Sequence, residues 1–342
     1  MKIALDATYS VGEKLSGVGV YSRELLNALA AAHPEQRFEF CYRPHRYVRS
    51  FARALPPNCG RTLLYEPTFP RGRDLFHGLN QRLPGIRFRK AVCTFHDLFV
   101  LTGDYSTPDF RKRFAEQARK AAAESDAIIA VSEFTASQVH ELLGVERARL
   151  RVVHHGANRR STQSGPRENI ILNVGAIQRR KNIARLVEAF ERTPADWTLV
   201  LAGSTGYGAA EILERIERSR RRRDIRVTGY LSERQLADWY ARARIFAFPS
   251  LDEGFGMPVL EAMAAGVPVI ASSRAALPEV CGNAAILVEP EDVDEIGLAI
   301  VRLIEDQNLA EEMIGRGHAR SAEFTWERAA KQTWQIYQGL AD

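Results

Sequence analysis

Residues Ile245–Glu279 read IFAFPSLDEGFGMPVLEAMAAGVPVIASSRAALPE, and the rest of the chain is best interpreted from this stretch. Its apolar run ends at Pro249, which is typical of a buried strand of a parallel sheet. A glycine-rich loop follows, and Pro258 suits the first helical position, where its missing N–H costs nothing. A second apolar run begins at Val269. The stretch therefore predicts a strand, a loop, a helix and a second strand of an open α/β sheet.

The loop and the start of the helix have the character of an anion site. The free amides of residues 256–259 should point to the mouth of the sheet, where the helix dipole also favours a phosphate. Glu253 and Glu261 are eight positions apart on either side of these amides. A carboxylate accepts two hydrogen bonds from a vicinal diol such as that of ribose or a hexose. The alternative is an ordinary strand–loop–helix unit with two solvated surface acids.

The segment E-G-F-G-M-P-V-L-E, Glu253–Glu261, resembles the E-x7-E motif of glycosyltransferase family four. Members of this family are retaining enzymes of the GT-B fold that use nucleotide sugars. The resemblance implies that Glu261 holds the ribose of the donor and that Glu253 holds hydroxyls of the donor sugar. The donor-binding segment between them is then Gly254, Phe255, Gly256, Met257, Pro258 and Val259.

Length and composition indicate two globular domains. The chain has 342 residues, of which 45% are hydrophobic and 26% charged, which suffices for two α/β domains. Its four cysteines lack CxxC spacing, which disfavours a zinc site or a disulfide framework and suits a reducing cytosol. With neither a signal peptide nor a run of eighteen apolar residues, we expect a cytoplasmic protein without a membrane span.

Charge is distributed unevenly along the chain. Residues 1–165 contain 25 Lys and Arg against 16 Asp and Glu, whereas the remainder contains 22 against 26. A basic half beside an acidic half suggests two surfaces with different partners. The basic segments 43–53, 71–90 and 111–113 fit a glycan or lipid-linked acceptor and peripheral contact with the inner face of an anionic membrane. The alternative is a soluble acceptor and solvated charges. No aromatic interleaving or nucleic-acid motif accompanies the cations, so nucleic acid is not an expected partner.

Near the N-terminus, a strand at Lys2–Asp6 is followed by a predicted loop that contains Gly17 and Gly19, with a helix from Tyr21 onward. The two glycines would let the backbone approach a diphosphate closely, although they also suit an ordinary loop. A dinucleotide-binding GxGxxG motif would need glycine where Ser22 stands, so that motif is rejected. The family resemblance implies a backbone contact from Gly17 to the donor phosphate.

His96 is the second residue after the predicted strand Lys90–Thr94. It therefore lies at the carboxyl end of a strand, where ligands bind in open α/β sheets. By itself, a lone histidine there is more often a structural hydrogen-bonding group than a catalyst. The resemblance implies that His96 contacts the donor sugar. At His155 the chain departs from the family, which usually has asparagine at that position.

A polar segment, Asn158–Asn169, predicts an interdomain linker. The next strand, Ile170–Val174, leads into the loop G-A-I-Q-R-R-K-N, whose cations can neutralise a diphosphate as the glycosidic bond breaks. A surface charge run is the alternative. The resemblance implies that Arg180 and Lys181 grip the diphosphate, and some family members carry arginine where this chain has Ala176.

Two further segments complete the second half. The backbone of Gly229, Tyr230 and Leu231 matches the family segment that faces the nucleobase. The run Arg220–Arg223 is interpreted as the solvated end of a helix that begins at Ala209. The resemblance implies that a final helix, residues 325–342, packs back on the first domain.

The alternation of strands and helices, repeated on each side of a polar linker, predicts two doubly wound parallel sheets with a ligand cleft between them. This is an α/β architecture of two Rossmann-like domains, and the resemblance identifies it as GT-B. We expect an acceptor-binding domain at residues 1–160 and a nucleotide-sugar-binding domain at 168–324.

These features predict a retaining hexosyltransferase that acts from a nucleoside diphosphate sugar. No D-x-D-type acidic cluster lies near the phosphate loops, so no metal and no other cofactor is expected. The phosphate loop resembles that of bacterial mannosyl- and rhamnosyl-transferases of polysaccharide assembly, which favours GDP-mannose over UDP- and dTDP-sugars. A nucleotide-sugar epimerase and a non-catalytic nucleotide-sugar-binding subunit are the rival functions.

Overall fold

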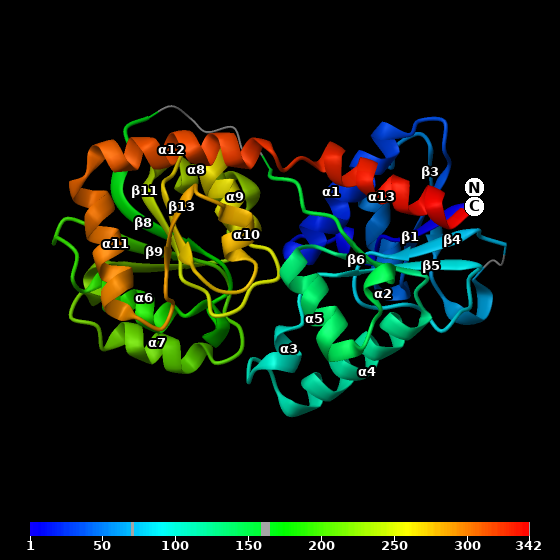
Figure 1. Cartoon of the computed structure of the whole chain (residues 1–342), viewed down its shortest axis with the longest axis horizontal. Helices are drawn as coiled ribbons and strands as arrows, with labels where there is room; N and C mark the ends of the chain where they lie inside the picture. The colour runs from blue at the N-terminus through cyan, green and yellow to red at the C-terminus, as the bar shows by residue number, and fades with distance from the viewer. Residues whose placement is uncertain (70–71, 159–164, 342) are drawn as a thin grey trace. The chain divides into compact units, whose positions relative to one another are not determined.

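The computed structural model describes residues 1–69, 72–158 and 165–341, which form two compact units (Figure 1). Unit 1 comprises Met1–Thr102, Pro108–Gly156 and Phe324–Asp342, and unit 2 comprises Gly103–Thr107 and Ala157–Glu323. Arg71 and residues 159–164 of the predicted linker lie outside the described residues.

Unit 1 is built on a seven-stranded parallel sheet with the order β3-β2-β1-β4-β5-β6-β7. Ile3 pairs with Phe38 on one side and with Leu75 on the other, so β1 lies centrally between β2 and β4. The chain reverses its direction of winding between β1 and β4, and ligands bind beside such a switch point at the carboxyl ends of the strands. The strands are β1 (Ile3–Asp6), β2 (Phe38–Tyr42), β3 (Cys59–Leu63), β4 (Leu75–Gly78), β5 (Lys90–Phe95), β6 (Ala127–Ala130) and β7 (Leu150–Val152).

The helices of unit 1 cover this sheet, and the C-terminal helix packs against α1. They are α1 (Gly17–Ala32), α2 (Pro44–Tyr47), α3 (Phe99–Thr102), α4 (Pro108–Glu124), α5 (Glu133–Leu143) and α13 (Trp326–Ala341). The loop predicted before Tyr21 was wrong, because α1 already begins at Gly17. Ser16 caps the helix by accepting a hydrogen bond from the amide of Gly19 at 3.3 Å, which explains the early start.

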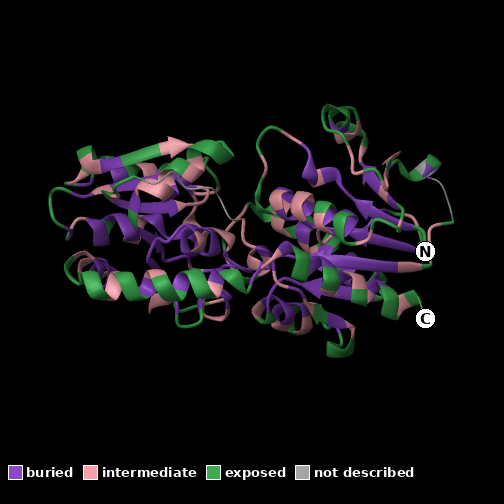
Figure 2. Cartoon of the chain, turned by 90° about the horizontal axis from the view of Figure 1, so that it is seen from above, coloured by how far each residue is buried: buried purple, intermediate pink, exposed green. Residues whose placement is uncertain are grey.

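Unit 2 is built on a six-stranded sheet with the order β10-β9-β8-β11-β12-β13, and every neighbouring pair is parallel. Its switch point lies between β8 and β11. The strands are β8 (Glu168–Val174), β9 (Thr198–Ala202), β10 (Ile225–Gly229), β11 (Ala243–Phe248), β12 (Val269–Ser272) and β13 (Ala285–Val288). Figure 2 shows the strands as largely buried, which accounts for their nearly continuous apolar sequences. The predicted α/β fold with two parallel sheets is confirmed.

Seven helices cover the described part of unit 2. They are α6 (Ile183–Phe190), α7 (Ala209–Glu217), α8 (Glu233–Arg242), α9 (Met257–Ala264), α10 (Leu277–Cys281), α11 (Val293–Glu305) and α12 (Gln307–Ala322). Helix α9 begins one residue before Pro258. None of the helices in the described ranges is both long enough and apolar enough to cross a bilayer.

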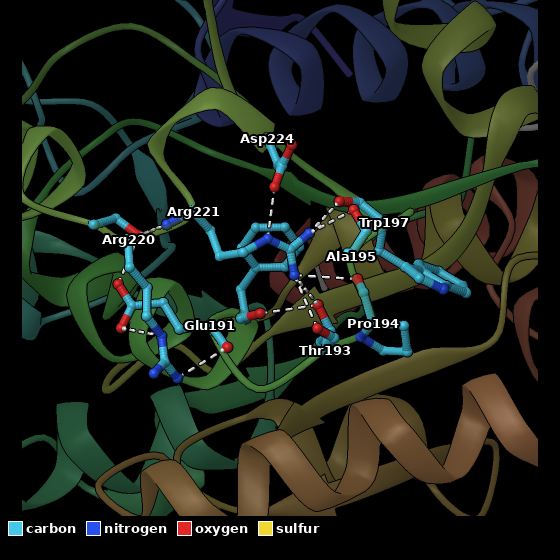
Figure 3. A network of polar contacts seen from close by, with 10 residues as sticks. Glu191, Thr193, Pro194, Ala195, Trp197, Arg220, Arg221 and Asp224 are labelled. Carbon is cyan, nitrogen blue, oxygen red and sulfur yellow. Dashed lines mark hydrogen bonds and ion pairs between the residues drawn. The ribbon is translucent and has the colours of Figure 1, made fainter.

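The interpretation of Arg220–Arg223 as a solvated helix end is correct only in part. Arg220, Arg222 and Arg223 are exposed, but helix α7 ends at Glu217 and the side chain of Arg221 is only 13% exposed. Its guanidinium donates to the carbonyl oxygens of Thr193 at 2.9 Å and Trp197 at 2.8 Å, and its Nε donates to Asp224 at 2.6 Å (Figure 3). Arg221 therefore closes the turn that leads into β9, because its fork of donors satisfies carbonyls that the turn leaves unpaired.

Candidate active site

Two loops meet at the switch point of unit 2, one after β8 and one after β11. The amide of Leu251 donates to the carbonyl of Arg180 at 2.8 Å, and the side-chain amide of Asn182 donates to the carbonyl of Pro249 at 2.9 Å. These bonds join residues far apart in the sequence, because β8 and β11 are neighbours in the sheet. The phosphate loop predicted from the sequence is thus tied to the loop that precedes Glu253.

Asn182 is the anchor of this arrangement. Its φ of 57° lies in the left-handed region, which asparagine tolerates better than most residues. Its side chain also donates to the carbonyl of Pro290 at 2.5 Å. Asn182 stands at the end of the G-A-I-Q-R-R-K-N loop, but no sequence pattern indicates this anchoring role.

A glycine behind the phosphate loop permits its close approach to β9. A Cβ atom at Gly203 would lie 1.9 Å from the carbonyl oxygen of Gly175, so no larger residue fits without a backbone shift. The amide of Gly175 donates to the carbonyl of Ala202 at 2.9 Å, and Gly203 forms a β-bridge with Gly229. The predicted nucleobase segment is therefore connected through Gly203 to the predicted phosphate loop.

Arg180, Lys181 and Glu253 form one contact cluster. Nη1 of Arg180 lies 2.9 Å from Oε2 of Glu253, and Nζ of Lys181 donates to Oε1 of the same carboxylate. Nη1 of Arg180 also donates to the carbonyl of Asp252. All three charged side chains are about nine-tenths buried, with 9% exposed. The ammonium of Lys181 additionally lies 4.6 Å from the centre of the Phe248 ring.

The cluster carries one more positive than negative charge. Burial by itself raises the pKa of Glu253, but the charges of Arg180 and Lys181 outweigh it and lower that pKa to about 2. Glu253 is therefore ionised at neutral pH and pairs with both cations. Two nearly buried cations held at the carboxyl ends of parallel strands favour an anionic ligand.

Helix α9 begins four residues after Glu253, and its first amides are additional backbone hydrogen-bond donors. Gly256 precedes the helix with a φ of 107°, and a Cβ atom there would lie 2.7 Å from Cδ2 of Leu277. No side chain of the described residues caps this helix N-terminus. Phe255 and Val259 are buried, whereas Met257 and Pro258 are partly exposed. The predicted anion-binding segment Gly254–Val259 thus begins α9 with a glycine that the geometry requires.

Glu261 lies in the middle of α9 and is 8% exposed. Its Oε2 accepts a hydrogen bond from the hydroxyl of Tyr240, on α8, at 3.2 Å. That hydroxyl is also 3.3 Å from the carbonyl of Pro258. Tyr240, for which the sequence gives no local signal, therefore orients the carboxylate predicted to hold the ribose.

The predicted nucleobase segment lies at the end of β10. Gly229 has a φ of 71°, in the left-handed region, and Tyr230 is 38% exposed. Leu231 is half-buried and precedes Ser232, the N-cap of α8. A backbone turn with an exposed flank suits the nucleobase contact predicted for this segment.

In unit 1, His96 directly follows β5 and is 7% exposed. Its Nε2 donates to the carbonyl oxygen of Leu79 at 3.0 Å, so the neutral ring carries its lone pair on Nδ1. Burial lowers the pKa of His96 to about 4, although the Leu79 carbonyl favours the charged form. The ring is therefore neutral at physiological pH and can accept a hydrogen bond.

A chain of buried hydrogen bonds runs behind His96. The hydroxyls of Tyr21 and Thr94 are 3.0 Å apart, and Thr94 lies 2.8 Å from Nε2 of His77. Nδ1 of His77 lies 2.5 Å from the hydroxyl of Tyr337, on α13. The Tyr21 ring packs edge-on against the His96 ring at 4.6 Å. These residues come from α1, β4, β5 and α13, and no local sequence signal links them.

His155 belongs to the same aromatic group. It is buried, its ring centre lies 5.5 Å from that of His96, and it stacks on Trp326 at 6.0 Å. Burial lowers the pKa of His155 well below its usual value, and the nearby His96 and His154 act in the same direction. Gly17 lies at the exposed start of α1.

The structure therefore brings Arg180, Lys181 and Glu253 into direct contact within unit 2. It places Glu261 on the helix that follows, and it places His96 and Gly17 in unit 1. In the parts of the chain that the structure describes, no three His, Cys, Asp or Glu side chains form a group that could hold a metal ion.

Two family models match the chain. The model described as "Glycosyl transferases group 1" matches residues 155–320, and the model described as "Glycosyltransferase Family 4" matches residues 15–160. The O-antigen chain mannosyltransferase B of Escherichia coli is 31% identical to this chain, over 99% of this chain and 100% of that protein.

Solved structures agree with the fold. Sucrose-phosphate synthase from Thermosynechococcus elongatus matches with a TM-score of 0.81 and 23% identity, over 99% of both chains. HepE of Anabaena, solved in complex with UDP-glucose, matches with a TM-score of 0.74 and 16% identity, over 100% of this chain and 99% of that one. At these identities the similarity concerns the fold, with two parallel sheets covered by alternating helices.

Proposed function

This chain belongs to glycosyltransferase family 4 and is a glycosyltransferase, and we propose that it transfers mannose from GDP-mannose, with retention of configuration, to a hydroxyl of a glycan or lipid-linked acceptor. The family predicted from the Glu253–Glu261 motif is thereby confirmed. The donor, the stereochemistry and the acceptor are our proposals.

The Arg180–Lys181–Glu253 cluster is the observation that supports a diphosphate donor. As the glycosidic bond breaks, negative charge grows on the leaving diphosphate, and two nearly buried cations stabilise it more strongly than solvated ones would. Their positions are set before the donor binds, since Glu253 and the loop bonds of Asn182 already hold them. The cluster therefore acts mainly on the transition state rather than on donor binding alone.

Glu253 has two tasks in this proposal. Its two oxygens offer about four acceptor sites, and Arg180 and Lys181 occupy only some of them. The remaining lone pairs can accept hydrogen bonds from donor-sugar hydroxyls. Because Glu253 is engaged with both cations, we assign the attack on the anomeric carbon to the acceptor hydroxyl, assisted by the departing phosphate, and not to a protein nucleophile.

His96 is proposed to contact the donor sugar through Nδ1. Its Nε2–H is committed to the carbonyl of Leu79, and the ring is neutral because burial lowers its pKa to about 4. The group therefore accepts a hydrogen bond from a sugar hydroxyl. Glu261, oriented by Tyr240, is proposed to bind the ribose, and the backbone of Gly229–Leu231 is proposed to face the base.

Mannose is proposed because the full-length relative from Escherichia coli is named an O-antigen chain mannosyltransferase. UDP- and dTDP-sugars are the competing donors, and HepE, which shares the fold, was solved with UDP-glucose. A thermal-shift panel of GDP, UDP and dTDP, followed by transfer assays with GDP-mannose, tests the assignment. A clear preference for UDP would refute it.

Retention is tested by the anomeric configuration of the product, measured by NMR coupling constants. An α-linked product from the α-configured donor supports retention, and a β-linked product contradicts it. The same assay without acceptor separates a transferase from an epimerase. Conversion of the nucleotide sugar into another nucleotide sugar without any acceptor would identify an epimerase instead.

Metal independence is proposed because Arg180 and Lys181 can supply the charge that a divalent ion supplies elsewhere. We expect full transfer activity in the presence of EDTA. A complete loss of activity on chelation, restored by a divalent cation, would overturn this part of the proposal.

The enzyme is proposed to work in the cytoplasm and to reach a lipid-linked acceptor from the inner face of the membrane. The support is the excess of cations in residues 1–165, which attracts anionic headgroups with about 1 kcal/mol for each Lys or Arg near the surface. Purely electrostatic attraction of this kind weakens as salt screens it. A soluble glycan acceptor with no membrane contact is the alternative.

A further inference from the structure

A short helical arm of unit 1 presents two apolar side chains to solvent. The arm consists of α2 and the following 3-10 helix η2 (Val48–Ala52). Val48 is 79% exposed and Phe51 is 60% exposed. Among the described residues of unit 1, no other large apolar side chain is as exposed as these two. The two residues are three positions apart on one arm, so they form a pair and are not scattered singly over the surface.

The arm is packed internally and is held in place by Arg61 of β3. Within the arm, the Tyr47 ring packs edge-on against Phe51 at 5.4 Å, and the guanidinium of Arg61 lies 4.3 Å over the Phe51 ring. Nη2 of Arg61 donates to the carbonyls of Ser50 at 2.9 Å and Arg53 at 3.0 Å. Phe51 is thus presented by a fixed scaffold, and it is not an end of the chain that happens to be exposed.

The charge around the two apolar side chains has one sign. No Asp or Glu occurs between Glu39 and Glu66, whereas five arginines do. Arg46 turns inward, where its Nη1 donates to the carbonyl of Val11 at 3.2 Å. The exposed cations that remain beside the apolar pair are Arg49 and Arg53.

We propose that the α2–η2 arm docks unit 1 on an anionic lipid surface, with Val48 and Phe51 in the interfacial layer and Arg49 and Arg53 against headgroup phosphates. Interfacial elements of membrane-bound proteins combine an apolar face with flanking cations in this way. The inference rests on the membrane contact of the proposed function and adds an apolar component to it. That component should persist at salt concentrations that abolish electrostatic attraction.

Charge favours a lipid surface over the other occupants of such a patch. In a symmetric dimer through the arm, Arg49 and Arg53 of one copy would face the same cations of the other, and like charges oppose that contact. A glycan would stack on the exposed ring of Phe51, but it would not need the surrounding positive charge. An anionic bilayer uses both features.

The test is co-sedimentation of the full chain with phosphatidylglycerol–phosphatidylcholine vesicles and with pure phosphatidylcholine vesicles. We expect binding to the anionic vesicles at about 0.1 M NaCl and weaker, residual binding at about 1 M, where the Debye length is about 3 Å. The Val48→Ser/Phe51→Ser variant should lose the residual binding at high salt, with a partition coefficient lowered about tenfold. The Arg49→Glu/Arg53→Glu variant should lose most binding at low salt.

Matched controls lie in unit 2, where Leu298 is 70% exposed and Arg223 is also exposed. Leu298→Ser and Arg223→Glu should bind vesicles like the wild type, and all variants should keep the wild-type unfolding temperature. Unchanged vesicle binding by the Val48→Ser/Phe51→Ser variant, or equal binding to neutral vesicles, would overturn the proposal.

Donor hydrolysis and transfer to a soluble glycan, measured without vesicles, distinguish this inference from the proposed function. Donor hydrolysis should be unchanged in both arm variants, and transfer to the soluble glycan should be unchanged in the Val48→Ser/Phe51→Ser variant, which keeps the cations of segment 43–53. If the Val48→Ser/Phe51→Ser variant loses transfer to the soluble glycan while vesicle binding is intact, the arm is a glycan site and the inference is wrong. If the wild type binds vesicles through the arm but does not use GDP-mannose, the inference is supported and the proposed donor is wrong.

Discussion

Arg180 and Glu253 form a nearly buried ion pair, with 2.9 Å between Nη1 and Oε2 and only 9% of each side chain exposed. The pair joins the loop after β8 to the loop after β11 across the switch point of the sheet. Removal of one partner from a buried pair leaves an uncompensated charge and typically costs about 3–5 kcal/mol. The pair is therefore both a structural tie and the electrostatic centre of the proposed donor site.

Replacement of Glu253 by glutamine should separate binding from transfer. The change removes the negative charge that competes with a diphosphate, so we expect nucleoside diphosphate affinity to rise several-fold while sugar transfer falls by roughly 10²-fold or more. Calorimetric titration and transfer assays check the two effects. Weaker diphosphate binding by Glu253→Gln would contradict the assignment of the cations to the diphosphate.

Replacement of Lys181 by methionine should lower kcat by roughly 10²–10³-fold, because it removes a buried cation from the leaving group. The neighbouring Arg179 supplies the control. Its side chain is 40% exposed and pairs with Glu211 and Asp104, so Arg179→Met should change kcat little. Steady-state kinetics of both variants test this difference. An equal loss of kcat in the two variants would mean that the cations of residues 179–181 act only as surface charges.

The hydrogen bond between Tyr337 and His77 should help to fix the position of the His96 ring. The Tyr337→Phe variant leaves a buried ring nitrogen of His77 without its partner, which typically costs about 1–3 kcal/mol of unfolding free energy. His77 is linked through Thr94 to Tyr21, whose ring packs on His96. We therefore expect kcat to fall while the KM for the donor stays constant. Tyr65→Phe, at a 48% exposed position, is the control. A loss of stability with unchanged kcat would limit the network to a structural role.

Stability should fall on mild acidification. Burial lowers the pKa of His96 to about 4 and that of His77 to about 3, so below pH 6.5 the unfolded chain binds protons that the folded chain does not. Each histidine then removes up to about 1.4 kcal/mol per pH unit from the unfolding free energy as the pH falls from 6.5 toward its folded pKa. Glu253, with a pKa of about 2, acts in the same direction between pH 4.5 and 2.

Denaturant unfolding between about pH 7 and pH 4.5 measures this effect. The slope should be smaller in a His96→Asn variant, which removes one of the titrating groups. A pH-independent unfolding free energy across this range would contradict the burial-based explanation. Because His96 is already neutral at pH 6.5, we expect no inflection from this group in the pH profile of kcat near that value.

Arg221 should be more important for stability than its position in an arginine run suggests. Arg221→Ala removes donors from the carbonyls of Thr193 and Trp197 and should cost about 2–4 kcal/mol. The Arg221→Lys variant should recover little of the lost stability, because lysine lacks the planar guanidinium that donates to several carbonyls at once. Arg223→Ala, at an exposed position in the same run, should change stability by less than about 0.5 kcal/mol. Thermal unfolding of the three variants tests the difference.

Local patterns in the sequence were sufficient for the architecture. The apolar runs, the glycines and the proline around Glu253 predicted the strand–loop–helix–strand unit, and the structure has β11, α9 and β12 there. These features depend on residues within a few positions of one another, so their spacing along the chain carries the information. The same spacing indicated the family, which the comparisons confirmed.

The contacts of the site were decided by the tertiary structure. Whether Arg180 and Lys181 meet Glu253 depends on β8 and β11 lying side by side, and β9 and β10 intervene between them in the chain. The same holds for Tyr337 and His77, and for Arg221, whose partners lie on another turn. Local periodicity cannot show which strands become neighbours, because that order follows from how all the helices and strands bury their apolar surfaces together.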